Sequence, residues 1–64
     1  MIRLTRLNGR EFLLNSELIK FLEETPDTVV TLVNGERVVV SERLDDIIER
    51  VIDFGRRLRA FPAV

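Results

Sequence analysis

Residues 28–40 read TVVTLVNGERVVV, and this stretch decides the fold. Residues that favour strands, mostly β-branched, lie on both sides of Asn34-Gly35. An Asn-Gly pair between two such runs predicts a β-hairpin with a two-residue type I′ turn, because both central residues of that turn need a positive φ. The predicted register places Thr31 opposite Val38.

A second Asn-Gly pair, Asn8-Gly9, separates the apolar residues of segment 2–7 from those of segment 11–14. The same reasoning predicts a first β-hairpin with another two-residue turn. Its register would place Arg6 opposite Glu11, and the opposite charges suit that pairing. The N-terminal two thirds of the chain is therefore expected to be antiparallel sheet.

Residues 17–24, between the two hairpins, allow two interpretations. A helix could begin after Asn15 or Ser16, both of which are good capping residues. Against this, Pro26 favours an extended residue before it, and Pro26-Asp27 is typical of a turn. We therefore favour a strand, which would pair with the next hairpin and complete a five-stranded meander.

The last third of the chain predicts an α-helix over residues 42–58. Its apolar residues recur at helical spacing: Leu44, Ile47, Ile48, Val51, Phe54 and Leu58. Ser41 is the expected N-cap, and Gly55 is expected to weaken or end the helix. With residues 59–64 as a flexible tail, the sequence predicts a single α+β domain over residues 1–64, with the sheet in residues 1–41.

Composition excludes several classes of protein and site. The chain has 64 residues, a net charge of −1, no Cys and no His. It therefore has no disulfide, no thiolate metal site and no imidazole for proton transfer. We expect no catalytic, cofactor-binding or metal-ligating residues, no small-molecule substrate, and hence no enzyme. The apolar runs are too short to span a bilayer, and segment 1–10 lacks the apolar core of a signal peptide, so we expect a cytoplasmic protein.

Both faces of the second hairpin look apolar, which predicts protein contact. In the predicted register Val30, Leu32 and Val39 share one face, and Val29, Val33, Val38 and Val40 share the other. One helix can cover only one of these faces. The other is expected to mediate a homo-oligomer or to bind a partner protein, with Arg3, Arg6 and Arg10 as candidate residues that orient an acidic partner.

Contacts with nucleic acid or membrane are disfavoured. Arginines lie near both ends of the chain and could contact phosphates, but acidic residues are scattered between them. There is no Tyr or Trp to stack on bases. An amphipathic end at residues 56–61 could rest on an anionic membrane surface, which makes any membrane contact peripheral.

The whole pattern resembles the FlbD/SwrD family of small bacterial flagellar proteins over about residues 1–55. The resemblance rests on Met1-Ile2-Arg3-Leu4-Thr5-Arg6-Leu7-Asn8-Gly9, Phe12, Leu14-Asn15, Leu18-Ile19, Glu23, Pro26-Asp27-Thr28, Leu32, Asn34-Gly35, residues 38–40, Ile47-Ile48 and Val51-Ile52. One departure is Arg43, where the family pattern would have a small capping residue.

The resemblance implies a small protein that is needed for full swarming motility. Its implied role is support of the flagellar motor, through motor or stator proteins, near the inner face of the cell membrane. A second interpretation is a small regulator of flagellar gene expression that acts on nucleic acid. Salt dependence distinguishes the two, since phosphate binding weakens steeply with salt.

Overall fold

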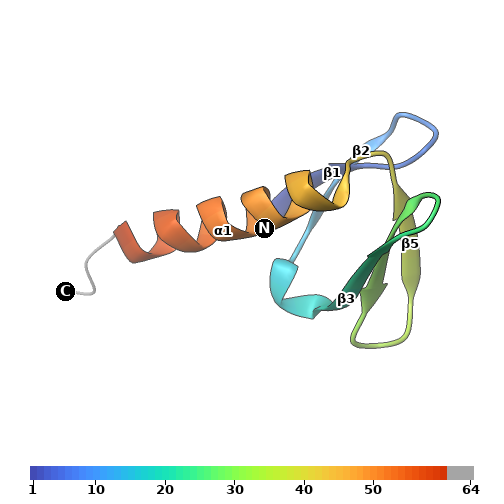
Figure 1. Cartoon of the computed structure of the whole chain (residues 1–64). Coiled ribbons are helices and arrows are strands. Elements are labelled where there is room, and N and C mark those ends of the chain that lie inside the picture. The colour runs from blue at the N-terminus through green and yellow to red at the C-terminus, as the bar shows by residue number, and fades with distance from the viewer. Residues whose placement is uncertain (61–64) are drawn as a thin grey trace.

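The computed structural model describes residues 1–60, with side chains through residue 57. It is an α+β protein, as predicted (Figure 1). In chain order the elements are β1 (Ile2–Thr5), β2 (Glu11–Leu14), the 3₁₀ helix η1 (Ser16–Leu18), β3 (Ile19–Glu24), β4 (Thr28–Leu32), β5 (Arg37–Val40) and α1 (Leu44–Ala60). The strand favoured for residues 17–24 is thus confirmed from Ile19 onward, and Asn15 caps only the single turn of η1.

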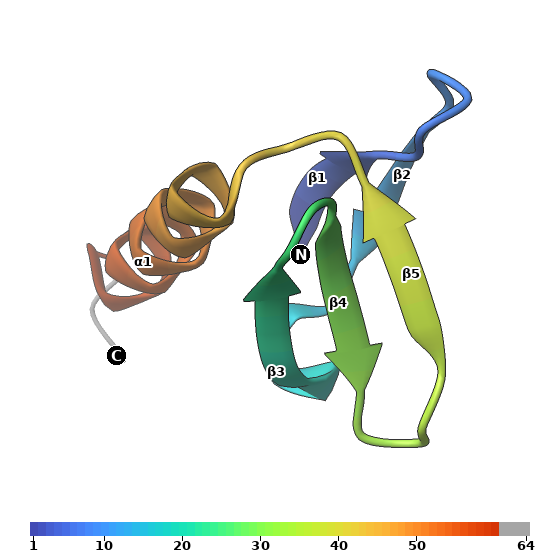
Figure 2. The ribbon, with the colours of Figure 1, turned by 45° about the vertical axis from the view of Figure 1, so that its right-hand side comes forward.

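The strands form two antiparallel sheets instead of one continuous meander. One sheet contains β1 and β2, and the other has the order β3-β4-β5. They meet where Arg6 forms an isolated bridge with Val40, and where the Ser41 N–H donates to the Thr5 carbonyl at 2.8 Å. Figure 2 shows the first hairpin passing behind the end of β5 at an angle to the second sheet. The space between the sheets holds the core.

Both Asn-Gly turns are three-residue loops, so the two-residue prediction was wrong. In the first, the Gly9 N–H donates to the Arg6 carbonyl at 2.9 Å, and the Arg6 N–H donates to the Arg10 carbonyl at 2.8 Å. Only glycine has a positive φ in the described chain, 89° at Gly9 and 92° at Gly35. This is a type I turn followed by a left-handed glycine, which forms a G1 bulge.

The asparagine side chains explain why this turn forms. Asn8 Oδ1 accepts the N–H of Arg10 at 3.0 Å, and Asn34 Oδ1 accepts the N–H of Glu36 at 2.9 Å. Each Asn therefore forms a local Asx hydrogen bond at negative φ, whereas a type I′ turn would need Asn at positive φ.

The longer loops shift both hairpin registers by one residue. Thr31 lies opposite Arg37, and not opposite Val38. In the first hairpin Thr5, and not Arg6, lies opposite Glu11. Because side chains alternate between the faces of a strand, this shift exchanges the faces predicted for one strand of each pair.

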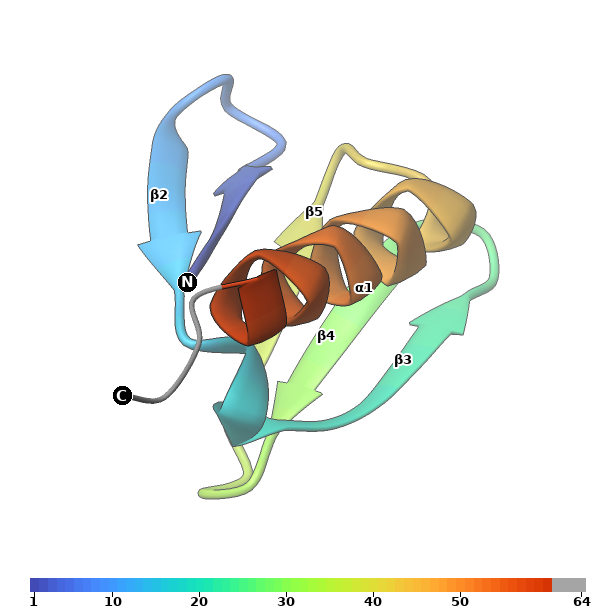
Figure 3. The same cartoon turned by 90° about the vertical axis from the view of Figure 1, so that its left-hand side faces the viewer.

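A small apolar core joins the two sheets to the helix. Its buried members are Ile2, Leu4, Leu14, Val30, Leu32, Val40 and Ile47. Helix α1 contacts β1 and β3 and covers the open side between the sheets (Figure 3). Ile47 is completely buried there, so the first half of α1 closes the core.

Helix α1 begins at Leu44 and is capped by a residue from another element. The Leu44 N–H donates to Glu24 Oε2 at 3.2 Å, and the same oxygen accepts the Thr28 hydroxyl at 3.3 Å. Ser41 is not the N-cap, because it lies three residues before Leu44 and its hydroxyl donates to the Thr5 carbonyl at 3.4 Å. An arginine at position 43 is tolerated because the carboxylate of Glu24 replaces the missing capping side chain.

The helix also differs from the prediction at its C-terminal end. It passes through Gly55 without interruption and continues to Ala60, two residues beyond the expected end. Most of the flexible tail expected over residues 59–64 lies outside the described residues.

Candidate interaction surface

The outer face of the β3-β4-β5 sheet, which faces away from the core, carries a mixed apolar surface. The register places six residues there: Phe21, Glu23, Val29, Thr31, Arg37 and Val39. The exposed fractions of Phe21 and Val39 are 46% and 38%. We call these six residues the outer-face patch. Exposed apolar surface of this kind is suited to contact with another macromolecule.

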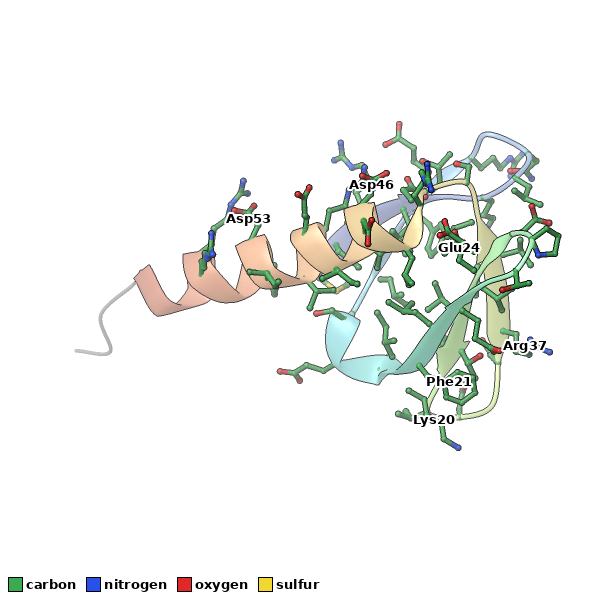
Figure 4. All side chains as sticks on the ribbon, in the orientation of Figure 1. Lys20, Phe21, Glu24, Arg37, Asp46 and Asp53 are labelled. Atoms are coloured by element: carbon green, nitrogen blue, oxygen red, sulfur yellow. The ribbon has the colours of Figure 1, made fainter. Side chains whose placement is uncertain are left out.

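Charged side chains lie within and beside this outer-face patch. Arg37 Nη2 lies 3.8 Å from Glu23 Oε1. This ion pair links the two edge strands of the sheet, β5 and β3. The Lys20 ammonium lies 6.0 Å from the centre of the Phe21 ring. Figure 4 shows Lys20, Phe21 and Arg37 together at the same end of the sheet. An apolar centre with charges around it is the usual composition of a protein interface.

The faces predicted for the second hairpin were wrong, for the reason that the register shifted. Val38 and Val40 lie on the core side with Val30, and Val40 is 1% exposed. Val39 lies on the outer face with Val29. The outer face is therefore less apolar than predicted, since it also carries Glu23, Thr31 and Arg37.

Thr31 is buried within the outer-face patch. It is 6% exposed, and its hydroxyl oxygen has no hydrogen-bond partner among the described residues. A buried hydroxyl without a partner costs free energy of folding. This residue is therefore a weak point in an otherwise well-paired sheet.

The three candidate arginines do not form one cluster. Arg3 lies on the outer face of β1, where its Nε is 3.5 Å from Glu11 Oε2. Arg6 lies over the Phe12 ring, with its guanidinium carbon 4.7 Å from the ring centre. Arg10 is exposed in the turn. They still make the first hairpin basic, because three arginines and one glutamate give residues 1–14 a side-chain charge of +2.

The predicted turn residues have structural roles. Asn8, Gly9, Asn34 and Gly35 form the two hairpin loops described above. Pro26 and Asp27 lie in the loop between β3 and β4, where the Thr25 N–H donates to the Asp27 carbonyl at 3.2 Å. All six residues are exposed, and their contacts explain them as turn formers.

A second apolar surface lies between α1 and β3, and the sequence analysis did not identify it. It is a groove of about 280 Å³ lined by Ser16, Ile19, Leu22, Ile48, Val51 and Ile52. Ile48 and Ile52 are 42% and 49% exposed. The sequence did indicate this groove, because the apolar residues of the helix form a wider stripe than the one needed to face the core.

One buried carboxylate joins the helix to the first hairpin. Glu42 Oε1 accepts the Thr5 N–H at 2.8 Å, and its Oε2 lies 3.0 Å from Arg50 Nη1. Arg50 also donates to the Arg3 carbonyl. Burial of the Glu42 side chain raises its pKa, but the hydrogen bonds from Thr5 and Arg50 outweigh burial and hold the pKa below its ordinary value. This network is structural and leaves no group poised for proton transfer.

Two further kinds of site are not found among the described residues. Within residues 1–60, no group of three or more acidic side chains is placed to hold a metal ion. Over the same part of the chain, no helix has the length and apolar character needed to cross a membrane.

Comparisons with known proteins give one match. The family model FlbD, described as flagellar and swarming motility proteins, matches residues 1–59. Comparison with curated proteins and with solved structures gave no match. The model match covers both hairpins and nearly all of α1, so it includes every surface described above.

Proposed function

Because this chain belongs to the FlbD family of flagellar and swarming motility proteins, we propose that it is a non-enzymatic protein-interaction module that supports the output of the flagellar motor. The proposal assigns its contact to a motor or stator protein at the inner face of the cell membrane. Flagellar motility itself is the role that the family implies.

The observation that carries the proposal is the outer-face patch. Phe21 and Val39 expose apolar surface on the β3-β4-β5 sheet, and Lys20, Glu23 and Arg37 lie around them with their charges. A chain of 64 residues with such a surface can support a motor by binding to one of its proteins. The basic first hairpin favours a partner with acidic residues beside its apolar contact, because complementary charge orients the encounter.

Gene deletion followed by complementation tests this function. Cells lacking the gene should assemble normal numbers of filaments but swim and swarm weakly. Complementation with Val39→Lys, in the outer-face patch, should fail to restore movement. Complementation with Leu13→Lys should restore it, because Leu13 is 60% exposed on the outer face of the other sheet.

Three outcomes would contradict the proposal. Missing filaments would indicate a role in assembly or in flagellar gene expression. Full activity of Val39→Lys would exclude the outer-face patch as the contact. Normal movement after deletion would refute a motility role for this chain. Thermal unfolding of both variants checks that neither result comes from loss of the fold.

A further inference from the structure

Helix α1 is longer than the part of the two sheets that it packs against. Its first turns close the core through Ile47 and Val51, whereas its last turns extend beyond both sheets (Figure 1). A helix end with no support from the rest of its chain is marginal in water, because helices gain most of their stability from packing. Phe54 is the last described side chain of α1 that packs against the core, and the helix backbone continues beyond it to Ala60.

The exposed side of α1 is apolar where it borders the groove. At about 100° per residue, Ile48 and Ile52 lie roughly 100° and 140° around the helix from the buried Ile47. Together with Ile19 and Leu22 they form the two walls of the groove. The apolar surface of α1 is therefore continuous from the core to the solvent-exposed side.

The charges beside this apolar side change sign along the helix. Glu49 and Arg56 are separated by two helical turns and border the same shallow depression around Ile52. Arg50 is paired with Glu42, and Arg57 is paired with Asp53 at 3.1 Å. Among the described side chains, Glu49 and Arg56 have no ion-pair partner within 4 Å.

We propose that two copies of this chain associate through antiparallel α1 helices, related by a two-fold axis that passes beside Ile52. The end of each helix that extends beyond its own sheets then lies along the groove of the other copy. The axis lies midway between Glu49 and Arg56, so Glu49 of each copy faces the partner's Arg56. A parallel pair would instead place like charges together.

This arrangement would stabilise the molecule in two ways. It covers Ile48 and Ile52 on both copies, and it gives the last turns of α1 a surface to pack against. Only seven apolar residues are buried in the described chain, four of them fully, and domains of this length commonly gain stability by oligomerisation. The interface uses the same patch on both copies, as two-fold dimers do. It leaves the outer-face patch free, so the proposal does not depend on the motor partner.

Single cysteines test the geometry directly, because the chain has no Cys. Ile52→Cys places a thiol next to its own symmetry mate and should give a disulfide-linked dimer under mild oxidation. Phe21→Cys is the matched control, since Phe21 is equally exposed but lies on the outer sheet face. It should stay monomeric on a non-reducing gel. Equal cross-linking of both variants would overturn the arrangement.

Light scattering after size-exclusion chromatography gives the second test. The unmodified chain should have about twice the monomer mass of 7.4 kDa, and Ile52→Glu should reduce it to the monomer while circular dichroism still reports a folded protein. Glu49→Arg and Arg56→Glu should each weaken the dimer, and the double variant should restore it. A monomer at all concentrations up to millimolar would refute the proposal. So would a dimer unaffected by Ile52→Glu, or a monomer whose helix binds anionic vesicles instead.

Discussion

Arg50 of α1 forms an ion pair with Glu42, which lies just before the helix, and their Nη1 and Oε2 atoms are 3.0 Å apart. The Glu42 side chain is 8% exposed. Because its other oxygen accepts the Thr5 N–H, this one carboxylate joins the helix to β1. The contact fixes the angle at which α1 leaves the sheets, and therefore the direction in which its last turns extend.

We predict that Glu42→Gln lowers the free energy of unfolding at neutral pH by about 1–2 kcal/mol, since it removes a charged hydrogen-bond acceptor from a largely buried site. The pKa of Glu42 is lower in the folded protein than its ordinary value of 4.5. Its stabilising effect is therefore complete above that value and is lost as the pH falls through the lower, folded pKa.

Urea unfolding of both proteins over a range of pH checks this. The difference between the unmodified chain and Glu42→Gln should be constant above about pH 5.5 and shrink as the pH falls toward 3. All other carboxylates are common to both proteins, so their titration cancels in the comparison. A difference that does not change with pH would show that the charge of Glu42 contributes nothing.

Glu24 provides the second prediction, because it replaces a conventional helix N-cap. Glu24→Ala should lower the free energy of unfolding by about 1 kcal/mol, since the N–H of Leu44 and the hydroxyl of Thr28 both lose their acceptor. Glu23→Ala is the matched control on the same strand, with only an exposed ion pair to Arg37 to lose. It should cost less than about 0.5 kcal/mol. Equal losses in denaturant unfolding would argue against the cap.

The sequence predicted the fold class well but missed the lengths of both turns. β-branched runs around Asn-Gly indicate a hairpin whichever turn forms, so the strands were identified correctly. The choice between two and three loop residues depends on whether Asn takes positive φ or uses its side chain as an acceptor. Asn8 and Asn34 do the latter. Because each loop has one residue more than predicted, one strand of each hairpin presents the opposite side chains to the core.

The surfaces for contact were harder to predict, because they depend on how the two sheets and the helix pack. Alternation along β5 alone does not reveal that Val39 faces outward, since the register sets the face. The Glu24–Leu44 cap joins residues that are far apart in sequence. The sequence shows that Ile48 and Ile52 widen the apolar side of α1. The other wall of the groove is formed by Ile19 and Leu22 of β3, and only the structure brings the two walls together.

Gly35 tests the structure of the turn. Gly35→Ala should lower the free energy of unfolding by about 1 kcal/mol, because an L-residue is strained at a φ of 92°. A Cβ at this position would meet no atom within 4 Å, so the cost is conformational and not steric. Gly35→Asn should cost less than alanine, since Asn tolerates the left-handed region better. Thermal unfolding that ranks the two variants in the opposite order would contradict this account.

The two buried threonines of β4 provide the last prediction, in which the same substitution has opposite effects. Thr31→Val should raise the free energy of unfolding by about 1 kcal/mol, because it removes a buried hydroxyl without a partner and keeps the shape of the side chain. Thr28→Val should lower it by a similar amount, because the Thr28 hydroxyl donates to Glu24 Oε2. Both changes are to a residue that favours strands, so that preference cancels between them. Denaturant midpoints that move in the same direction would show that hydroxyl pairing does not decide the stability of this strand.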